Sequence, residues 1–147
     1  MGVRHVKGDL FTLGLPALAH GCNCAGSMAG GIARAFRALD EAMYREYRRQ
    51  CRDGELRLGG IFRWTLEDCT VVYNLATQQQ PGADARLGAI TSSVAEMLDD
   101  AERSGIPEVG VPHLGAGIGG LAWPDVREVL EEAGRASPVL LTVVARG

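Results

Sequence analysis

Two short glycine-rich segments are the parts of this sequence whose residue types and spacing point most directly to chemistry. They are residues 26–31 (GSMAGG) and residues 115–120 (GAGIGG). Because glycine has no Cβ, backbone N–H groups in such a loop can come within hydrogen-bonding distance of an anion. Each segment follows an apolar run typical of a strand and precedes a helical pattern, so a helix N-terminus adds donors and a favourable dipole. Two such loops in one short chain predict a single ligand held from two sides, such as a diphosphate.

The elements that position these loops are predicted from the spacing of apolar residues. Pro124 suits the first turn of a helix, and the break at Glu67 and Asp68 between two β-branched runs predicts a hairpin. Residues 77–85 are polar, contain Pro-Gly and are interpreted as a loop. The predicted strands cover residues 3–7, 17–21, 61–65, 70–75, 109–112 and 139–144, and the predicted helices begin near residues 32, 41, 87 and 124.

The order of these elements, β, β, α, α, β, β, α, β, α, β, predicts an α/β fold. We expect three layers, α/β/α, around a mixed, mostly parallel central sheet of about six strands. In such sheets ligands bind beyond the carboxyl ends of the strands, where both glycine loops fall. Since the sequence contains no internal repeat and no linker, we expect one domain over residues 1–147.

The composition is that of a soluble globular protein with a core of ordinary size. The chain has 147 residues, of which 46% are hydrophobic and 22% charged, and its net charge is −3. That charge argues against general nucleic-acid binding, because such binders need clustered positive charge. The cluster of Arg45, Arg48, Arg49 and Arg52 is interpreted as the solvated face of an amphipathic helix. With no leader pattern and no apolar run of membrane-spanning length, we expect a cytoplasmic protein that does not bind membranes.

The four cysteines, Cys22, Cys24, Cys51 and Cys69, are expected to be reduced in that compartment. Cys22 and Cys24 beside His20 have the residue types of a metal site. A structural zinc site needs four ligands, however, and no second closely spaced pair is present. We therefore expect buried structural thiols and no metal.

Residues 115–120 also match the dinucleotide fingerprint G-x-G-x-x-G. That fingerprint belongs to the first βαβ unit, whereas here it precedes the last helix and the last strand. The acidic residue expected in the following strand is absent from the run that begins at Val139. An NAD-dependent oxidoreductase is therefore disfavoured, and we expect the loop to bind phosphate in another fold, without a cofactor.

Three motifs resemble those of the macrodomains, a family that binds ADP-ribose. Residues 7–11 (KGDLF) look like the family's opening motif. Residues 19–23 (AHGCN) with residues 28–32 (MAGGI) look like its first ligand loop, and residues 111–118 (VPHLGAGI) look like its second. The branch that the chain most resembles includes terminal ADP-ribose protein glycohydrolase, the DNA ADP-ribosyl glycohydrolase antitoxins and the fungal ADP-ribose 1″-phosphate phosphatase. The motifs occur in the family's order and span nearly the whole chain.

The resemblance implies a role for each motif in holding ADP-ribose. Asp9 would accept a hydrogen bond from the adenine amine, although a Gly-Asp pair is also typical of a turn. Asn23 would reach the distal ribose, or else would cap the turn that follows it. Residues 115–119 would wrap the diphosphate through backbone donors. The implied ligand-binding residues are Asp9, Leu10, His20, Asn23, Ser27, Met28, Gly30, Gly31, Ile32, Thr77, Gly115, Ala116, Gly117, Ile118 and Gly119.

The catalytic residues of the branch's lysine-using hydrolases are missing from this chain. Those enzymes carry a Lys after the fourth strand and an Asp in the second glycine loop, where this chain has residues 77–80 (TQQQ) and 118–120 (IGG). Two routes remain. In one, a substrate phosphate oxygen orients a water molecule held between the distal ribose and the diphosphate. In the other, His20 acts as general acid or base, unless it is a packed histidine at a strand end.

Asp84 is the second candidate catalytic residue, since it lies in the loop that would cross the distal ribose. It and Arg86 would contact the substrate there, or would simply be solvated, as most loop charges are. Together these patterns predict an enzyme that hydrolyses ester-linked mono-ADP-ribose from modified proteins. The alternatives are a non-catalytic ADP-ribose reader and an ADP-ribose 1″-phosphate phosphatase. We expect a monomer whose partners are ADP-ribose or ADP-ribosylated proteins.

Overall fold

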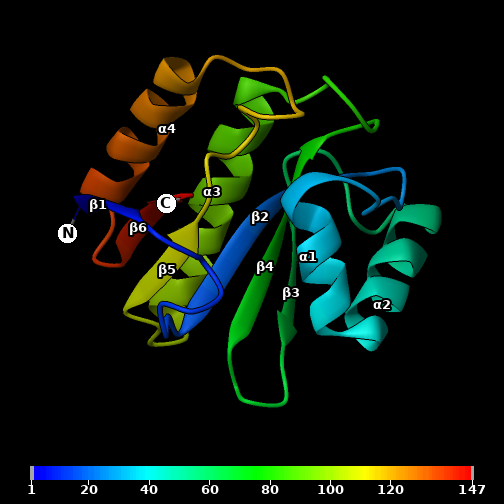
Figure 1. Ribbon diagram of the computed structural model, residues 1–147, viewed down its shortest axis with the longest axis horizontal. Coiled ribbons are helices and arrows are strands. Elements are labelled where there is room, and N and C mark those ends of the chain that lie inside the picture. Colours follow the sequence, from blue (N-terminus) through cyan, green and yellow to red (C-terminus); the bar gives the residue numbers. More distant parts are fainter. Residues whose placement is uncertain (1, 147) are drawn as a thin grey trace.

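The computed structural model describes residues 2–146, which form one six-stranded sheet with helices on both faces (Figure 1). The strands are β1 (Gly2–Lys7), β2 (Ala17–Asn23), β3 (Ile61–Thr65), β4 (Val71–Gln78), β5 (Glu108–Val111) and β6 (Leu140–Ala145). The helices are α1 (Gly31–Leu39), α2 (Glu41–Arg52), α3 (Leu87–Arg103) and α4 (Trp123–Arg135).

The strands lie in the order β1-β6-β5-β2-β4-β3. Every neighbouring pair is parallel except β3 and β4, which form the predicted antiparallel hairpin. The predicted element order and the mixed, mostly parallel sheet are thus confirmed. Because β5, β2 and β4 are parallel neighbours, the loops that follow them begin at one edge of the sheet. Both glycine-rich segments follow strands of this group.

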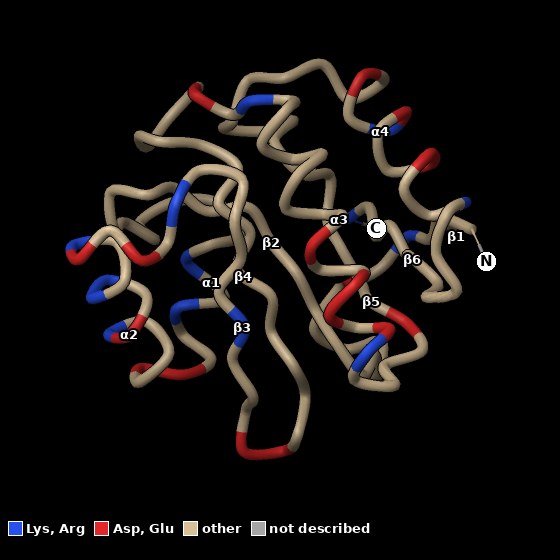
Figure 2. Tube along the Cα trace, turned by 180° about the vertical axis from the view of Figure 1, so that it is seen from behind, with Lys and Arg blue, Asp and Glu red and all other residues tan. Residues whose placement is uncertain are grey.

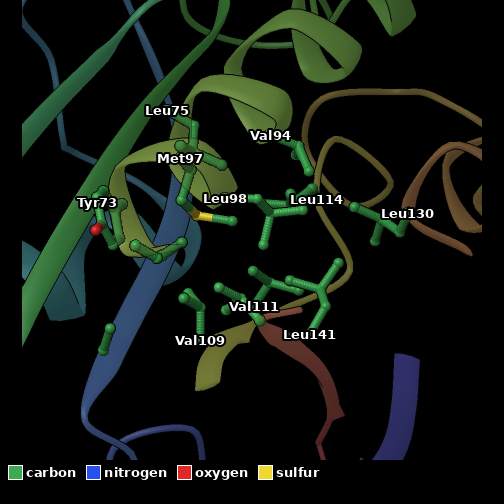
Figure 3. Packing of buried hydrophobic residues seen from close by; sticks show 14 of the residues in the cluster. Tyr73, Leu75, Val94, Met97, Leu98, Val109, Val111, Leu114, Leu130 and Leu141 are labelled. Atoms are coloured by element: carbon green, nitrogen blue, oxygen red, sulfur yellow. The ribbon is translucent and has the colours of Figure 1, made fainter. Parts of the chain in front are cut away.

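Alternation of side chains along the strands divides the core into two layers. Val71, Tyr73 and Leu75 of β4 face α3 and α4, whereas Val72 and Ala76 of the same strand face α1 and α2. Figure 3 shows part of the first layer, where side chains from β4, β5, β6, α3 and α4 converge. The sheet is therefore covered on both faces, which confirms the predicted α/β/α layers.

Helix α2 has the amphipathic character predicted for it. Its buried side chains are Met43, Tyr44 and Tyr47, while the arginine cluster lies on the exposed or half-exposed face. Arg49 of that cluster pairs with Glu46 at 2.7 Å, three residues earlier on the same helix. The arginines of α2 are thus a solvated face, as expected. Within residues 2–146, no helix has the length and apolar character needed to cross a membrane.

Two strands continue further toward the glycine loops than apolar spacing predicts. β2 ends at Asn23 and β4 ends at Gln78, and a register shift after Cys22 brings these two end residues into a pair. The prediction of a loop beginning at residue 77 is therefore wrong for Thr77 and Gln78. Gln78 pairs with Asn23 across the sheet, and Thr77 lies at the register shift between two paired residues. Both side chains are polar, so apolar spacing did not mark these positions as strand residues.

A close approach between α4 and β1 makes Gly134 a sensitive packing position. A Cβ at Gly134 would lie 2.5 Å from Cγ2 of Val3 and 3.0 Å from the carbonyl oxygen of Gly2. We predict that Gly134→Ala lowers the free energy of unfolding by about 1–2 kcal/mol, because overpacking exceeds the gain in helix propensity. Gly88→Ala in α3 is the matched control, since a Cβ there meets nothing within 4 Å. Denaturant unfolding measures the free energy of unfolding of both variants. An equal change in the two variants would contradict the prediction.

Candidate ligand-binding site

The two glycine-rich loops meet at the carboxyl ends of β2 and β5. Ile118 of the second loop lies over the first loop, since a Cβ at Gly31 would be 3.0 Å from its Cδ1 atom and one at Gly30 would be 3.5 Å away. Ile118 is nevertheless 59% exposed. The structure thus brings together two segments that are far apart in the sequence, as the prediction of one ligand held from two sides requires.

Three helices begin at this edge, and none of them has a side-chain cap. The residues preceding α1, α3 and α4 are Gly30, Arg86 and Ala122, and none accepts a hydrogen bond from the helix through its side chain. Helix α2, which begins elsewhere, is capped by Asp40, whose carboxylate accepts from the N–H of Met43 at 3.0 Å. The N–H groups of the first turn of α1 and α3, where no acidic residue stands, are therefore favourable to an anion.

The shape of the first loop depends on Asn23. Its Oδ1 accepts from the N–H groups of Ala25 at 3.0 Å and Ser27 at 3.2 Å, and its Nδ2 donates to the carbonyl of Ser27 at 2.8 Å. The hydroxyl of Tyr47 on α2 donates to the carbonyl of Asn23 at 2.6 Å. The Asn23 side chain therefore folds the loop, which is the capping alternative considered from the sequence, and Met28 is buried beneath it.

The second loop depends on glycines with a positive φ and on backbone atoms that approach too closely to leave room for a Cβ. Gly115 and Gly120 have φ of 69° and 85°, a conformation that favours glycine. A Cβ at Gly119 would lie 2.7 Å from the carbonyl oxygen of Gly115, so this position accepts no other residue without distortion. Gly117, by contrast, has open space where a Cβ would be. The outer face of the loop is thus formed largely of main chain.

His20 lies inside the protein and has no exposed surface. Its Nε2 is 2.6 Å from Oδ1 of Asn74, and its ring stacks on Phe36 at 3.9 Å between centroids and 5° between planes. Burial lowers the pKa of His20 to about 4, although the bond to Asn74 acts in the opposite direction. His20 is therefore neutral and enclosed, which matches the packed histidine considered from the sequence, although it lies within β2 and not at its end. Its buried ring is not in reach of a substrate as an acid at neutral pH.

Asp84 supports the loop between β4 and α3. Its Oδ2 accepts from the N–H groups of Gln79 and Gln80, both at 2.9 Å, and these bonds to the backbone lower the pKa of its carboxyl. Arg86 lies 3.4 Å from its Oδ1. Asp84 is therefore an ionised, partly exposed carboxylate at this edge whose contacts in residues 2–146 shape the loop. Thr77, at the end of β4, is buried against Gly21, where a Cβ would lie 2.7 Å from its Oγ1.

Asp9 stands in the turn after β1, at the same edge but across β6 and β5 from β2. Its Oδ1 accepts from the N–H of Phe11 at 2.9 Å, as in the turn considered from the sequence, and within residues 2–146 its Oδ2 has no partner. Leu10 is buried against β5, since a Cβ at Gly110 would lie 2.9 Å from its Cδ1. Phe11 packs edge-on against Phe36 with centroids 4.9 Å apart. That aromatic contact connects the Asp9 turn to α1 and hence to the first glycine loop, a link that sequence spacing did not indicate.

The cysteines differ in their surroundings more than was expected. All four are free thiols: Cys22 is buried, Cys24 and Cys51 are half-buried, and burial raises the pKa of Cys24 to about 11. The prediction of a buried thiol is wrong for Cys69, which is exposed in the turn of the β3–β4 hairpin with a φ of 75°. Across residues 2–146, no group of three or more His, Cys, Asp or Glu side chains is arranged to hold a metal ion.

Comparisons with known proteins identify the family and the fold of this chain. The macro domain family model matches residues 19–130, so the chain belongs to the macro domain family. The macrodomain of Mycobacterium tuberculosis DarG superposes with a TM-score of 0.90 at 29% identity, covering 97% of this chain and 96% of that one. The macrodomain of Thermus aquaticus DarG gives a TM-score of 0.87 at 27% identity, with 97% of both chains covered.

The curated relatives of this chain are named for different activities. The chain is 30% identical to the DNA ADP-ribosyl glycohydrolase of Mycobacterium tuberculosis over 97% of its own length but only 41% of that protein. It therefore spans about two fifths of that relative. It is also 28% identical to the ADP-ribose 1″-phosphate phosphatase of Candida albicans, with 88% of this chain and 92% of that protein covered.

Burial of a neutral His20 predicts a fold that loses stability in acid. In the unfolded chain, His20 has the ordinary pKa of 6.5 and is protonated below that pH. In the folded protein, His20 stays neutral until the pH falls to about 4. Stability is therefore fully present above pH 6.5 and decreases as the pH falls toward 4, by an amount on the order of 3 kcal/mol. Denaturant unfolding at a series of pH values measures this slope. His20→Gln, which retains a donor for Asn74, should flatten it, and an unchanged slope in that variant would assign the loss to other groups.

Proposed function

We propose that this macrodomain binds ADP-ribose and hydrolyses ADP-ribosyl groups from modified proteins, as ester-linked mono-ADP-ribose. The proposal rests on one observation. The two glycine loops meet at the edge of the sheet where α1, α3 and α4 begin without a side-chain cap. Backbone N–H groups and helix N-termini suit a diphosphate, because they donate hydrogen bonds without any cation to desolvate.

The ligand is oriented by the order of the three motifs along the edge. The diphosphate lies along residues 115–119, the distal ribose lies at Gly30 and Gly31, and the adenine lies toward the unpaired carboxylate oxygen of Asp9. Because the exposed side chain of Ile118 occupies the space over Gly30 and Gly31, a ligand that enters between the loops displaces it. Relatives named DNA ADP-ribosyl glycohydrolase support an ADP-ribosyl group as the ligand.

The mechanism uses a positioned water molecule and no lysine adduct. Lys7 is the only lysine of the sequence, and it stands at the end of β1 beside the turn assigned to adenine. The buried, neutral His20 is likewise excluded as a base by its surroundings. A water molecule held between the distal ribose and the diphosphate, and oriented by a phosphate oxygen of the substrate, therefore attacks C1″. The C1″–O ester bond breaks, its electron pair leaves with the side-chain carboxylate of the modified protein, and the proton of the water passes by way of the phosphate oxygen to solvent. Such positioning contributes up to about 7–11 kcal/mol of barrier lowering in favourable cases.

Two other activities have an observation in their favour. A phosphatase acting on ADP-ribose 1″-phosphate is supported by the similarity to the Candida albicans enzyme over nearly the whole of both chains. DNA as the carrier of the ADP-ribosyl group is supported by the two DarG macrodomains, whose folds superpose on this one almost completely. The same edge would hold the ADP-ribosyl part in each case, so the activities differ in what is attached at C1″.

Turnover of three matched substrates tests the reaction. We predict release of ADP-ribose from an auto-ADP-ribosylated protein carrying glutamate esters, no release of inorganic phosphate from ADP-ribose 1″-phosphate, and no release from ADP-ribosylated single-stranded DNA. Asp84→Asn is included as the variant of the carboxylate in the loop between β4 and α3. Release from DNA alone would move the proposal to a nucleic-acid carrier, and tight binding without any product would make the protein a reader.

Binding is tested separately from turnover by two substitutions at opposite ends of the site. Gly117→Glu adds a like charge beside the diphosphate where the structure has open space, so we predict weakening by at least about tenfold. Asp9→Ala should weaken ADP-ribose binding by about 1–3 kcal/mol through loss of a hydrogen-bond partner. Ala136→Glu, exposed at the far end of α4, is the control. Calorimetric titration with ADP-ribose measures all three, and an unchanged affinity of Gly117→Glu would remove the second loop from the site.

A further inference from the structure

An open groove of about 760 Å³ lies between helix α2 and strand β3, outside the candidate site. None of its lining residues belongs to a glycine loop or to the Asp9 turn. One wall is the face of α2 that carries Arg45 and Arg49, and the other is β3, with Phe62 and Trp64. Figure 1 shows β3 as the last strand on this side of the sheet, with α2 nearby.

The backbone of β3 has hydrogen-bonding groups that point into the open edge. Antiparallel pairs alternate between hydrogen-bonded and non-hydrogen-bonded residues. Leu66 donates to the carbonyl of Thr70 at 2.8 Å, and Ala76 donates to the carbonyl of Gly60 at 3.0 Å, so the hydrogen-bonded pairs on β3 are those of the even-numbered residues. The N–H and C=O groups of the odd-numbered residues, Ile61, Arg63 and Thr65, therefore face away from β4.

This edge is a template for another strand. A row of unpaired donors and acceptors beside a groove is the arrangement by which several peptide-binding domains add an extended ligand to a sheet. A helix parallel to such an edge limits the side chains that the added strand can carry. In this protein the limiting wall is α2, so its charges determine which ligand fits.

The charges of the groove favour an acidic ligand. Its lining contains three arginines and one glutamate. Arg49 is compensated by Glu46, Asp53 and Glu55, and Arg63 by Asp100 at 2.8 Å. Arg45 makes no ion pair with any residue that the structure describes, and its charge acts only at longer range on Asp40, which accepts from Nε1 of Trp64 at 3.0 Å. Figure 2 shows Lys and Arg positions on α1, α2 and β3, with Asp and Glu positions on α2 as well as on α3. Phe62 and Trp64 add apolar surface at the floor.

We propose that α2 and β3 form a docking groove for an extended, acidic segment of a partner protein, which adds a seventh strand beside β3. Its backbone pairs with the outward groups of Ile61, Arg63 and Thr65, and a carboxylate on its inner face reaches Arg45. A second copy of this chain is a poorer occupant, because pairing two β3 edges would bring the arginines of both copies together. The groove thus supplies a partner contact that leaves the glycine-loop edge open.

The probe is an acetylated eight-residue peptide of alternating glutamate and valine, labelled with fluorescein at its carboxyl end. We expect saturable binding by fluorescence anisotropy, and slower hydrogen exchange at the amides of Ile61, Arg63 and Thr65 in the peptide complex. The same peptide with lysine in place of glutamate should not bind. Arg45→Glu should weaken binding by at least about fivefold, whereas Arg135→Glu on α4 should leave it unchanged.

Thr65→Pro separates backbone pairing from charge. It removes one outward N–H without removing a bond to β4, and should weaken binding by about tenfold or more. Retained calorimetric affinity for ADP-ribose would show that the variants are folded. Equal binding of the lysine peptide, unprotected β3 amides at saturation, or no binding of the acidic peptide to the folded protein would each overturn the proposal. Protection of the β3 amides without peptide, in a protein that light scattering shows to be a dimer, would instead assign the edge to a second copy.

Discussion

The stack of His20 on Phe36 is the contact on which the geometry of the ligand-binding edge depends. Phe36 is the one fully buried residue of α1, and with the partly buried Ile32 and Ala33 it anchors the helix that begins at the first glycine loop. The same ring meets Phe11, which follows the Asp9 turn. On the other side, His20 is held by Asn74, whose Nδ2 donates to the carbonyl of Phe62 at 3.1 Å. One chain of contacts therefore runs from the β3 edge, through the sheet, to both ends of the site.

The contacts of His20 with Phe36 and Asn74 explain why this histidine is buried and not exposed to a ligand. With Nε2 bonded to Asn74, the ring is neutral, and its Nδ1 is a buried atom without a hydrogen-bond partner in the described residues. An unpaired buried polar atom costs about 1–3 kcal/mol. The stacked contact with Phe36, at 3.9 Å between centroids, adds close packing on one face of the ring. The position of His20 is thus specified by packing, with its ring between Asn74 and Phe36.

A site formed mainly of backbone groups also accounts for the variety of activities named among the relatives. In the site that we propose, Gly30, Gly31 and residues 115–119 supply amides that suit any ligand with an ADP-ribosyl group, whatever is attached to it. Proteins named as DNA ADP-ribosyl glycohydrolase and ADP-ribose 1″-phosphate phosphatase share this fold or sequence pattern. Since fold and function are only loosely tied, specificity must come from residues at the rim, such as Asp84 and Ile118, and from partner contacts elsewhere.

Apolar periodicity and glycine content determined the element order, the mixed sheet, the layers and the meeting of two loops at one edge. Those features follow from local patterns, because strand and helix periods and the absence of a Cβ are properties of short segments. Only the tertiary structure decided that Asn23 is used to fold its own loop, that Asp84 holds the loop before α3, and that β2 and β4 extend to Asn23 and Gln78. The environment of His20 was decided there too, because the pKa of a side chain depends on neighbours from distant segments, here Phe36 and Asn74. The unpaired side of the β3 backbone was also decided by the tertiary structure. The sequence predicts the strand, but its place at the edge of the sheet depends on how distant strands are ordered.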